Sequence, residues 1–184
     1  MIHDKSRAFW VGASDTDKVM GNYQTATWKS WYLEKLGLRR DTLQTKAMKV
    51  GNAFEHKVLD TIPGISKDDQ IILEDIGLRV NYDGILNDHI YEVKTYSADV
   101  FKVSKKYWQQ AQVEILAYEL MHDVTPELTI LAYHVTEDDY ANYFRPIDKE
   151  RLSEWPIEKD PAFLAEYQEK LAYLHECIKK GIMP

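Results

Sequence analysis

The stretch GLRVNYDGILNDHIYEVKTY, from Gly77 to Tyr96, contains the features that best predict the fold and the chemistry of this chain. Apolar and polar residues alternate over residues 77–83, which is typical of a half-buried strand. Residues 89–95 have the composition of a second strand. The dipeptide Asp83-Gly84 between them is typical of a tight hairpin turn. The stretch therefore predicts two antiparallel strands, with Asp83 at the end of the first.

Three charged side chains are predicted to gather on this hairpin. Side chains alternate along a strand with a period of two, so Glu92 and Lys94 project from the same face. The step from Asp83 to Glu92 suits a hairpin that brings the two carboxylates together. Adjacent carboxylates repel each other unless a cation lies between them, and Mg²⁺ takes a few fixed oxygen ligands, such as these and the carbonyl of Val93. With Lys94 beside the metal-bound water, the pattern indicates metal-assisted phosphodiester hydrolysis.

A Glu-x-Lys pair on a strand also has a simpler explanation. Most such pairs are solvent-exposed ion pairs worth less than about 1 kcal/mol. Here Ile90, Tyr91 and Val93 surround the pair, so the strand is predicted to be half buried. Charged groups in a buried strand need partners, and this favours the functional interpretation.

A third carboxylate precedes the hairpin, in a helix predicted over residues 45–61. Gly51 and Glu55 are four residues apart, so they share one face of that helix. Glycine inside a helix costs roughly 1 kcal/mol relative to alanine and usually marks a close approach. The approaching group is either the backbone of bound DNA or a packed helix, and the sequence leaves both explanations open.

A helix rich in glutamine follows the hairpin and reads YWQQAQ over residues 107–112. With the carboxylates and the lysine before it, it resembles the PD-(D/E)xK nuclease superfamily, in which the RecB and YqaJ branches carry a glutamine-containing helix after the Glu-x-Lys strand. Gln110 is the closest match to the Tyr-x-x-Gln element of that helix, and Gln112 is the second candidate. The residues that carry the resemblance, in chain order, are Glu55, Asp83, Glu92, Lys94 and Gln110.

The N-terminal segment RAFWVGASD, residues 7–15, separates the branches of the superfamily. Its Arg7-x6-Ser14 pattern resembles the start of YqaJ-type, lambda exonuclease-like phage recombination exonucleases, in which this Arg and Ser bind a 5′ phosphate. A helix beginning at Asp15 and capped by Ser14 would present free N–H groups to an anion, and Arg7 would add a bidentate contact. Capping alone, or a surface ion pair of Arg7, would also explain these residues. Val50 departs from the family, which commonly has an aromatic residue before the helix glycine.

The resemblance implies a Mg²⁺-dependent deoxyribonuclease, for which Mn²⁺ can substitute. It implies a 5′→3′ exonuclease that degrades duplex DNA from its ends and leaves 3′ single strands for phage-type recombination. Asp83, Glu92 and the Val93 carbonyl would bind the metal, and Glu55 would bind a second metal or its water. Lys94 would orient the attacking water and help to deprotonate it, and Gln110 would position a ligand or phosphate. A single-strand annealing protein as partner and a homotrimer around DNA are further implications.

Two other functions remain open. The first alternative to the exonuclease is a structure-specific or restriction-like endonuclease of the same superfamily. The second is a catalytically inactive module that binds DNA ends. The iron–sulfur branch of the superfamily needs several cysteines, and the single Cys177 excludes it.

The composition is that of one globular domain spanning residues 1–184, with 45% hydrophobic and 29% charged residues. No apolar run approaches the roughly 18 residues of a membrane helix, and the single cysteine favours a reducing, cytoplasmic setting. The net charge of −7 argues against a nucleic-acid partner. However, residues 1–52 carry nine Lys/Arg and five Asp/Glu, so the basic charge is concentrated near Arg7 and Ser14.

The remaining pattern predicts an α/β (α+β) fold with a central mixed sheet flanked by helices, the restriction-endonuclease-like core. Short and long helices are expected at 15–21, 25–36, 45–61, 104–122 and 161–180. A buried strand is expected at 128–135, with 142–146 as an edge strand beside it. His56, His122 and His134 lack metal-ligand spacing and are expected to be structural, as are most of the tryptophans.

Overall fold

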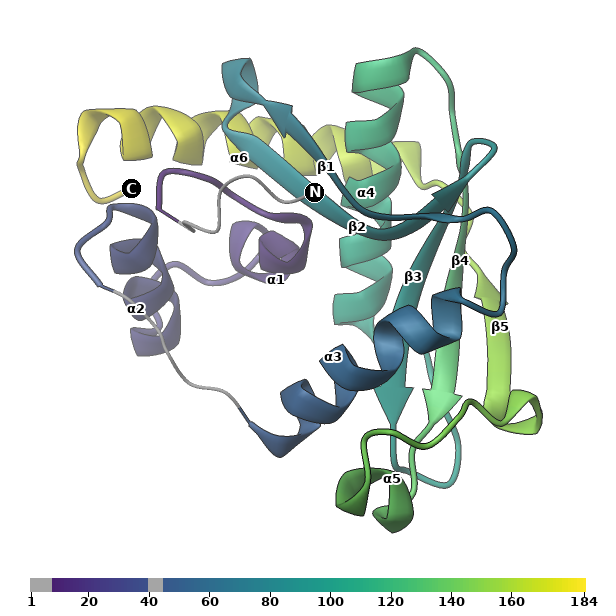
Figure 1. The fold of residues 1–184 in the computed structure, drawn as a ribbon. Coiled ribbons are helices and arrows are strands. Elements are labelled where there is room, and N and C mark those ends of the chain that lie inside the picture. The colour runs from purple at the N-terminus through teal and green to yellow at the C-terminus, as the bar shows by residue number, and fades with distance from the viewer. Residues whose placement is uncertain (1–7, 40–44) are drawn as a thin grey trace.

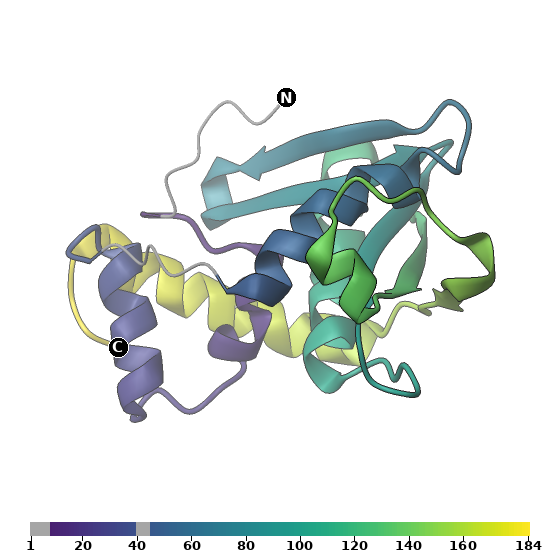
Figure 2. The same cartoon turned by 60° about the horizontal axis from the view of Figure 1, so that its bottom comes forward.

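The computed structural model describes residues 8–39 and 45–184, which form a five-stranded sheet with helices on both faces (Figures 1 and 2). The strands are β1 (Ser66–Leu73), β2 (Leu78–Leu86), β3 (His89–Tyr96), β4 (Glu127–His134) and β5 (Leu152–Pro156), and they lie in that order. The β3–β4 pair is parallel and the other pairs are antiparallel. The predicted α/β fold with a mixed central sheet is confirmed.

Helices occur at all five predicted places, apart from a few residues at their ends, and the described residues contain one further short helix, at residues 137–141, that was not predicted. The helices are α1 (Thr16–Val19), α2 (Ala26–Lys35), α3 (Lys46–Leu59), α4 (Lys105–His122), α5 (Glu137–Ala141) and α6 (Pro161–Lys180), with the 3-10 turns η1 (Ala13–Asp15), η2 (Glu74–Ile76) and η3 (Lys149–Arg151). None of the helices in the described part of the chain has the length and apolar character needed to cross a membrane.

Two apolar layers hold the helices against the sheet. Side chains of β4 alternate between them, as the pleat of a strand requires. Ile130 and Ala132 belong to the larger core with α4 and α6, whereas Leu131 and Tyr133 belong to the smaller core with α3. Figure 1 shows α3 crossing in front of the sheet and α4 behind it. The buried strand predicted at 128–135 is confirmed, and both of its faces are covered.

The helix α4 is the crossover between the parallel strands β3 and β4, a connection that parallel pairing requires. Ser104 caps it, because the Ser104 hydroxyl accepts a hydrogen bond from the backbone N–H of Tyr107 at 3.2 Å. The helix therefore starts shortly after β3 ends and returns across the sheet. This path carries the glutamines of α4 past the charged residues of β3.

The hairpin turn lies at Asn87-Asp88, so the prediction of a turn at Asp83-Gly84 is wrong. Asn87 and Asp88 have φ values of 50° and 59°, as a two-residue turn between twisted strands demands. Strand β2 continues through Gly84, which pairs with Tyr91. Gly84 has a different reason to be glycine: a Cβ there would lie 2.5 Å from Ile65 Cδ1 and 2.8 Å from Leu59 Cδ2. Glycine thus allows β2 to pack closely against the end of α3.

The edge strand beside β4 is β5, so the prediction of a strand at 142–146 is also wrong. Lys57 of α3 donates hydrogen bonds to the backbone carbonyls of Tyr143 and Arg145. This contact holds the segment against α3 and away from the sheet. Residues 152–156 pair with β4 instead.

Replacing Gly84 with alanine is expected to lower the free energy of unfolding by about 1–3 kcal/mol, since the added methyl group overpacks the contact with Leu59 and Ile65. Gly51→Ala is the matched control, because a Cβ there meets only Thr95 Oγ1, at an ordinary 3.5 Å. Alanine should stabilise that helix position by up to about 1 kcal/mol. Urea unfolding measures both, and equal midpoints would contradict the close packing of α3 on β2.

Candidate functional site

The strands β2 and β3 are paired only next to their turn, from Leu86–His89 to Gly84–Tyr91. At the next position the carboxylate of Asp83 accepts a hydrogen bond from the backbone N–H of Val93 at 2.8 Å. Asp83 thus substitutes a side-chain acceptor for a backbone one and remains attached to β3 where the ladder stops. This contact places its carboxylate at the opening between the strands.

The regular alternation of side chains between the two faces of β2 is interrupted at this opening. Tyr82 and Ile85 contribute to the core beneath α4, whereas Gly84 packs against the end of α3. On the other side of β2, the regular pairing with β1 passes from Lys67–Gly84 to Asp69–Tyr82 and skips Asp68, which has a φ of 56°. Asp68 and Asp83 therefore lie where the regular sheet is interrupted.

Glu92, Lys94 and Gln110 form a triangle of contacts on the α4 side of β3. The amide nitrogen of Gln110 donates to Glu92 Oε1 at 2.6 Å, and the Lys94 ammonium is paired with the same carboxylate. Lys94 Nζ also lies 3.3 Å from Gln110 Oε1. Glu92 is 4% exposed, so these contacts replace the solvent that its charge would otherwise need. The spacing-based prediction that Glu92 and Lys94 share a face agrees with this geometry.

Glu55 approaches the group from α3. Burial raises the pKa of Glu55, and the negative charge of Glu92 raises it further. Burial is also the main reason that the pKa of Asp83 lies well above its ordinary value, with Glu92 and Glu55 adding to the effect. The three carboxylates predicted from the sequence are therefore close enough to interact through their charges.

Lys94 is the cation at the centre of these carboxylates. Burial alone would lower the pKa of Lys94, but the charges of Glu92 and Asp83 outweigh it and raise the pKa above the ordinary value. The ring of Tyr107, the first residue of the Tyr-x-x-Gln element, lies 5.1 Å from the ammonium. The lysine is thus protonated and held in place from two sides.

Glu114 is a member of this group that the sequence reasoning missed. It is fully buried, and its Oε1 accepts a hydrogen bond from the amide of Gln110 at 2.8 Å. Burial and the nearby charge of Glu92 raise the pKa of Glu114 well above its ordinary value. The four-residue spacing from Gln110 on one helix face is the signal by which it could have been found.

Gln112 and Gly51, two further candidates from the sequence, have other surroundings. Gln112 is buried, donates to the backbone carbonyl of Glu158 at 2.7 Å and accepts from the N–H of Asp160, so it joins α4 to the segment before α6. Gly51 faces Thr95 with room for a Cβ, so packing within the protein does not require glycine there. The close approach of DNA to Gly51 remains a prediction.

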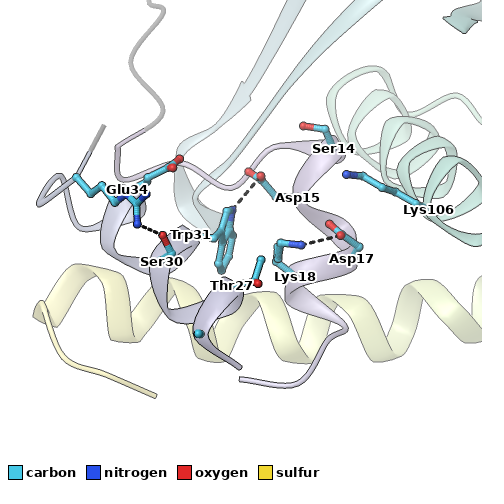
Figure 3. A pocket seen from close by; sticks show the side chains of 11 residues that line it. Ser14, Asp15, Asp17, Lys18, Thr27, Ser30, Trp31, Glu34 and Lys106 are labelled. Carbon is cyan, nitrogen blue, oxygen red and sulfur yellow. Dashed lines mark hydrogen bonds and ion pairs between the residues drawn. The ribbon is translucent and has the colours of Figure 1, made fainter. Parts of the chain in front are cut away.

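Ser14 is exposed and lines a cavity of about 690 Å³ between the N-terminal helices and the start of α4 (Figure 3). The prediction that Ser14 caps a helix is wrong, because η1 begins at Ala13 and the backbone N–H of Gly12 donates to Asp15 Oδ2 at 2.9 Å. Arg7, its predicted companion, lies outside the described residues. The cavity also contains the cationic side chains of Lys18, Arg39 and Lys106.

The floor of this cavity is fixed by Asp15. Its two carboxylate oxygens accept hydrogen bonds from Trp31 Nε1 at 2.9 Å and from Lys35 Nζ at 2.6 Å. Lys106 forms the opposite wall, and it precedes Gln110 by one turn of α4. The cavity and the carboxylate group therefore lie along the same face of one helix.

His56 and Asp68 extend the carboxylate group beyond the sequence prediction, which treated His56 as structural. Their side chains are 3.1 Å apart, and their ligand atoms and that of Glu55 all lie within 4.8 Å of one another. Asp68 comes from β1 and His56 from α3, so no local spacing could reveal the contact. One imidazole and two carboxylates are donors that suit Mn²⁺ and related ions.

Carboxylates with one imidazole are donor types that suit a divalent cation, and Glu55, His56 and Asp68 are the described residues whose ligand atoms lie within 4.8 Å of one another. The charges of Glu55, Asp83 and Glu92 act on one another with Lys94 among them, which leaves an excess of negative charge. Mg²⁺ and Mn²⁺ prefer oxygen ligands of this kind. A bound cation would reduce the repulsion between these carboxylates.

No protein-family model and no curated protein matches this sequence. Among solved structures, it is similar to the alkaline exonuclease LHK-Exo from Laribacter hongkongensis, with 17% identity, a TM-score of 0.68, and 95% of this chain and 90% of that one covered. A phage-related exonuclease from Haemophilus somnus gives 14% identity, a TM-score of 0.68, and 94% and 95% coverage. This chain has the fold of these exonucleases. The resemblance inferred from the motifs is confirmed at the level of the fold, which extends over nearly the whole length of each chain.

Replacing Asp83 with asparagine is expected to raise the stability of the metal-free protein at pH 7 above that of the wild type. The folded-state pKa of Asp83 is raised, so its ionisation disfavours folding, and stability falls as the pH rises from the unfolded value toward the folded one. Asparagine keeps an acceptor for the Val93 N–H without the charge.

Thermal unfolding in EDTA between pH 5 and pH 8 measures this effect. The exposed Asp99→Asn is the control and should change nothing. Added Mn²⁺ should stabilise the wild type more than Asp83→Asn. A variant that is less stable than the wild type at pH 7 would contradict the electrostatic account.

Proposed function

We propose that this chain is a metal-dependent deoxyribonuclease, and specifically a 5′→3′ exonuclease acting on duplex DNA ends. The observation that carries the proposal is the convergence of Asp83, Glu92, Lys94 and Gln110 where β2 and β3 separate. Glu55 joins them from α3. The fold shared with exonucleases supports the same chemistry, and fold alone would not specify it.

Asp83, Glu92 and the Val93 carbonyl would hold the first Mg²⁺ or Mn²⁺, and Glu55 with His56 and Asp68 would hold a second. Bound there, such ions lower the pKa of a coordinated water and offset the charge on a phosphate. Lys94 orients the attacking water through its ammonium group. Cations on the carboxylates would weaken the negative charge that keeps Lys94 protonated, and so allow it to help in deprotonating that water.

Gln110 keeps Glu92 and Lys94 in a fixed relation through its two contacts. The charged groups of Glu92 and Lys94 would therefore already be in position when a phosphate binds in the opening. Such preorganisation is the main contribution of the protein in phosphoryl transfer.

The cavity lined by Ser14 would receive the 5′ end of the DNA. Its lining has three cations, Lys18, Arg39 and Lys106, beside the carboxylates of Asp15, Asp17 and Glu34, and Lys18 is paired with Asp17 at 2.9 Å. Lys106, with the hydroxyls of Ser14 and Ser30, would therefore supply the contacts to the phosphate (Figure 3). Because Lys106 and Gln110 share a helix face, a strand bound in the cavity would lead toward the carboxylates. Arg7 would contribute to the same phosphate contact.

The biological setting follows from the resemblance alone. It includes phage-type recombination, a single-strand annealing protein as partner, a homotrimer around DNA and a cytoplasmic location. LHK-Exo, which shares this fold, has been solved in complex with dAMP, and a nucleotide ligand agrees with the DNA substrate proposed for this chain. With a net charge of −7, DNA binding by the chain should depend strongly on salt and on the divalent ion.

Linear duplex DNA is expected to be degraded in the presence of Mg²⁺ or Mn²⁺, and EDTA should abolish the reaction. Lys94→Ala should lower the rate by about a hundredfold or more, because the ammonium that orients the water is lost. Lys179→Ala on α6 is the matched control. Equal digestion by wild type and Lys94→Ala would overturn the proposal.

The same assay separates the alternatives. Early release of a 5′ label rather than a 3′ label establishes the polarity. Cleavage of a closed circle would instead favour the endonuclease. Cation-independent binding to DNA ends, without digestion, would favour the inactive module.

A 5′-phosphorylated end is expected to be used with a lower KM than a 5′-hydroxyl end. Ser14→Ala and Lys106→Ala should each reduce that preference by roughly tenfold, because each removes a contact with the charged phosphate. Lys149→Ala in η3 lies outside the cavity lining and should leave the preference intact. An unchanged preference in both cavity variants would rule out this role for the cavity.

A further inference from the structure

Glu114 lies in the middle of α4, one helical turn after Gln110, and is fully buried. Its carboxyl group is an unusual choice for an interior position. One oxygen, Oε1, is bonded to Gln110, but Oε2 has no hydrogen-bond partner among residues 8–39 and 45–184. A buried carboxyl with an unpaired oxygen costs stability that an apolar side chain would not. Packing alone therefore does not account for it.

The contact with Glu114 determines how the amide of Gln110 is turned. An amide nitrogen carries two N–H donors. Here Nε2 donates to Glu92 Oε1 at 2.6 Å and to Glu114 Oε1 at 2.8 Å. With both donors engaged by carboxylates, the amide oxygen faces Lys94 Nζ at 3.3 Å. The opposite orientation would place the amide oxygen against two carboxylate oxygens.

The backbone of Glu114 is anchored as well. Its carbonyl accepts a hydrogen bond from the hydroxyl of Tyr82 at 3.0 Å, and Tyr82 immediately precedes Asp83 on β2. One residue thus links the strand that carries Asp83 to the helix that carries Gln110. A shift of α4 relative to β2 would therefore change the position of Gln110 relative to Asp83.

We propose that Glu114 is a positioning residue that acts through Gln110: it fixes the amide so that the Gln110 oxygen holds the Lys94 ammonium where it orients the attacking water. This inference rests on the proposed nuclease function. It assigns Glu114 no contact with substrate or metal. It predicts that the effect of Glu114 on catalysis exists only while Gln110 is present.

Glu114→Met removes the acceptor and keeps an apolar side chain of similar length. We expect kcat on linear duplex DNA to fall between about tenfold and a hundredfold, with KM within twofold of the wild type. Thermal stability should be equal to or above that of the wild type, so misfolding would not explain the loss. Glu114→Gln retains an oxygen acceptor and should keep kcat within about threefold. Glu119→Met, on the same helix and paired with Lys159, is the control for losing a helix carboxylate.

A double-mutant cycle separates positioning from general destabilisation. In a Gln110→Ala background, Glu114→Met should cause no further loss of kcat. Additive losses would overturn the proposal, as would an unchanged kcat in Glu114→Met alone. A Glu114→Gln variant as slow as Glu114→Met would also contradict it, because the acceptor would then not be what matters.

The side-chain amide signals of Gln110, assigned in ¹H–¹⁵N spectra by their loss in Gln110→Ala, test the contact without any activity. They should shift in Glu114→Met and stay near their wild-type positions in Glu119→Met. Unchanged signals in Glu114→Met overturn the inference whether or not the chain degrades DNA. If the wild type proves inactive while the signals respond, the proposed function fails and the catalytic part of the inference fails with it, but the orientation of Gln110 by Glu114 is upheld.

Discussion

Lys94 is the positive charge around which the carboxylates of Asp83, Glu92 and Glu114 gather, with Glu55 close by. In a partly buried setting like charges repel strongly, so such a group forms only if the rest of the molecule holds it together. Two features do so: the hydrogen bond from the Val93 N–H to Asp83, and the bonds of Gln110 to Glu92 and Glu114. The raised pKa values of Asp83 and Glu114 reflect the same repulsion.

The sheet is built so that both sides can contribute to this group. The apolar layer under α3 and the layer under α4 are separate, and β3 and β4 divide their side chains between them. Where β2 separates from β3, the alternation of side chains along β2 is interrupted. Residues from both α3 and α4 therefore approach the opening between the two strands. The glycine at position 84 permits this by letting α3 pack closely beside β2. Hydrophobic burial on two faces thus offsets the electrostatic cost at the opening.

Sequence reasoning found the parts of the site that depend on local periodicity. Glu92 and Lys94 share a face because a strand repeats every two residues, and Gln110 lies on the helix that follows. It failed where the deciding contact joins distant segments. Asp83-Gly84 resembled a turn, but Gly84 is needed for contact with Leu59 and Ile65. His56 and Asp68 are brought together only by the packing of α3 on the sheet, and the cavity around Ser14 only by the packing of α4 on the N-terminal helices.

The sequence by itself determined the mixed α/β architecture, the places of α1, α2, α3, α4 and α6, and the presence of three carboxylates, a lysine and a glutamine in the order of a nuclease motif. These properties follow from spacing and propensity, which act over a few residues. The tertiary structure decided where β2 turns, which strand covers the edge of β4, that Gln110 rather than Gln112 meets Glu92, and that Glu114 completes the group. These depend on which faces pack together across the chain, and such packing is a property of non-local contacts that no short segment encodes.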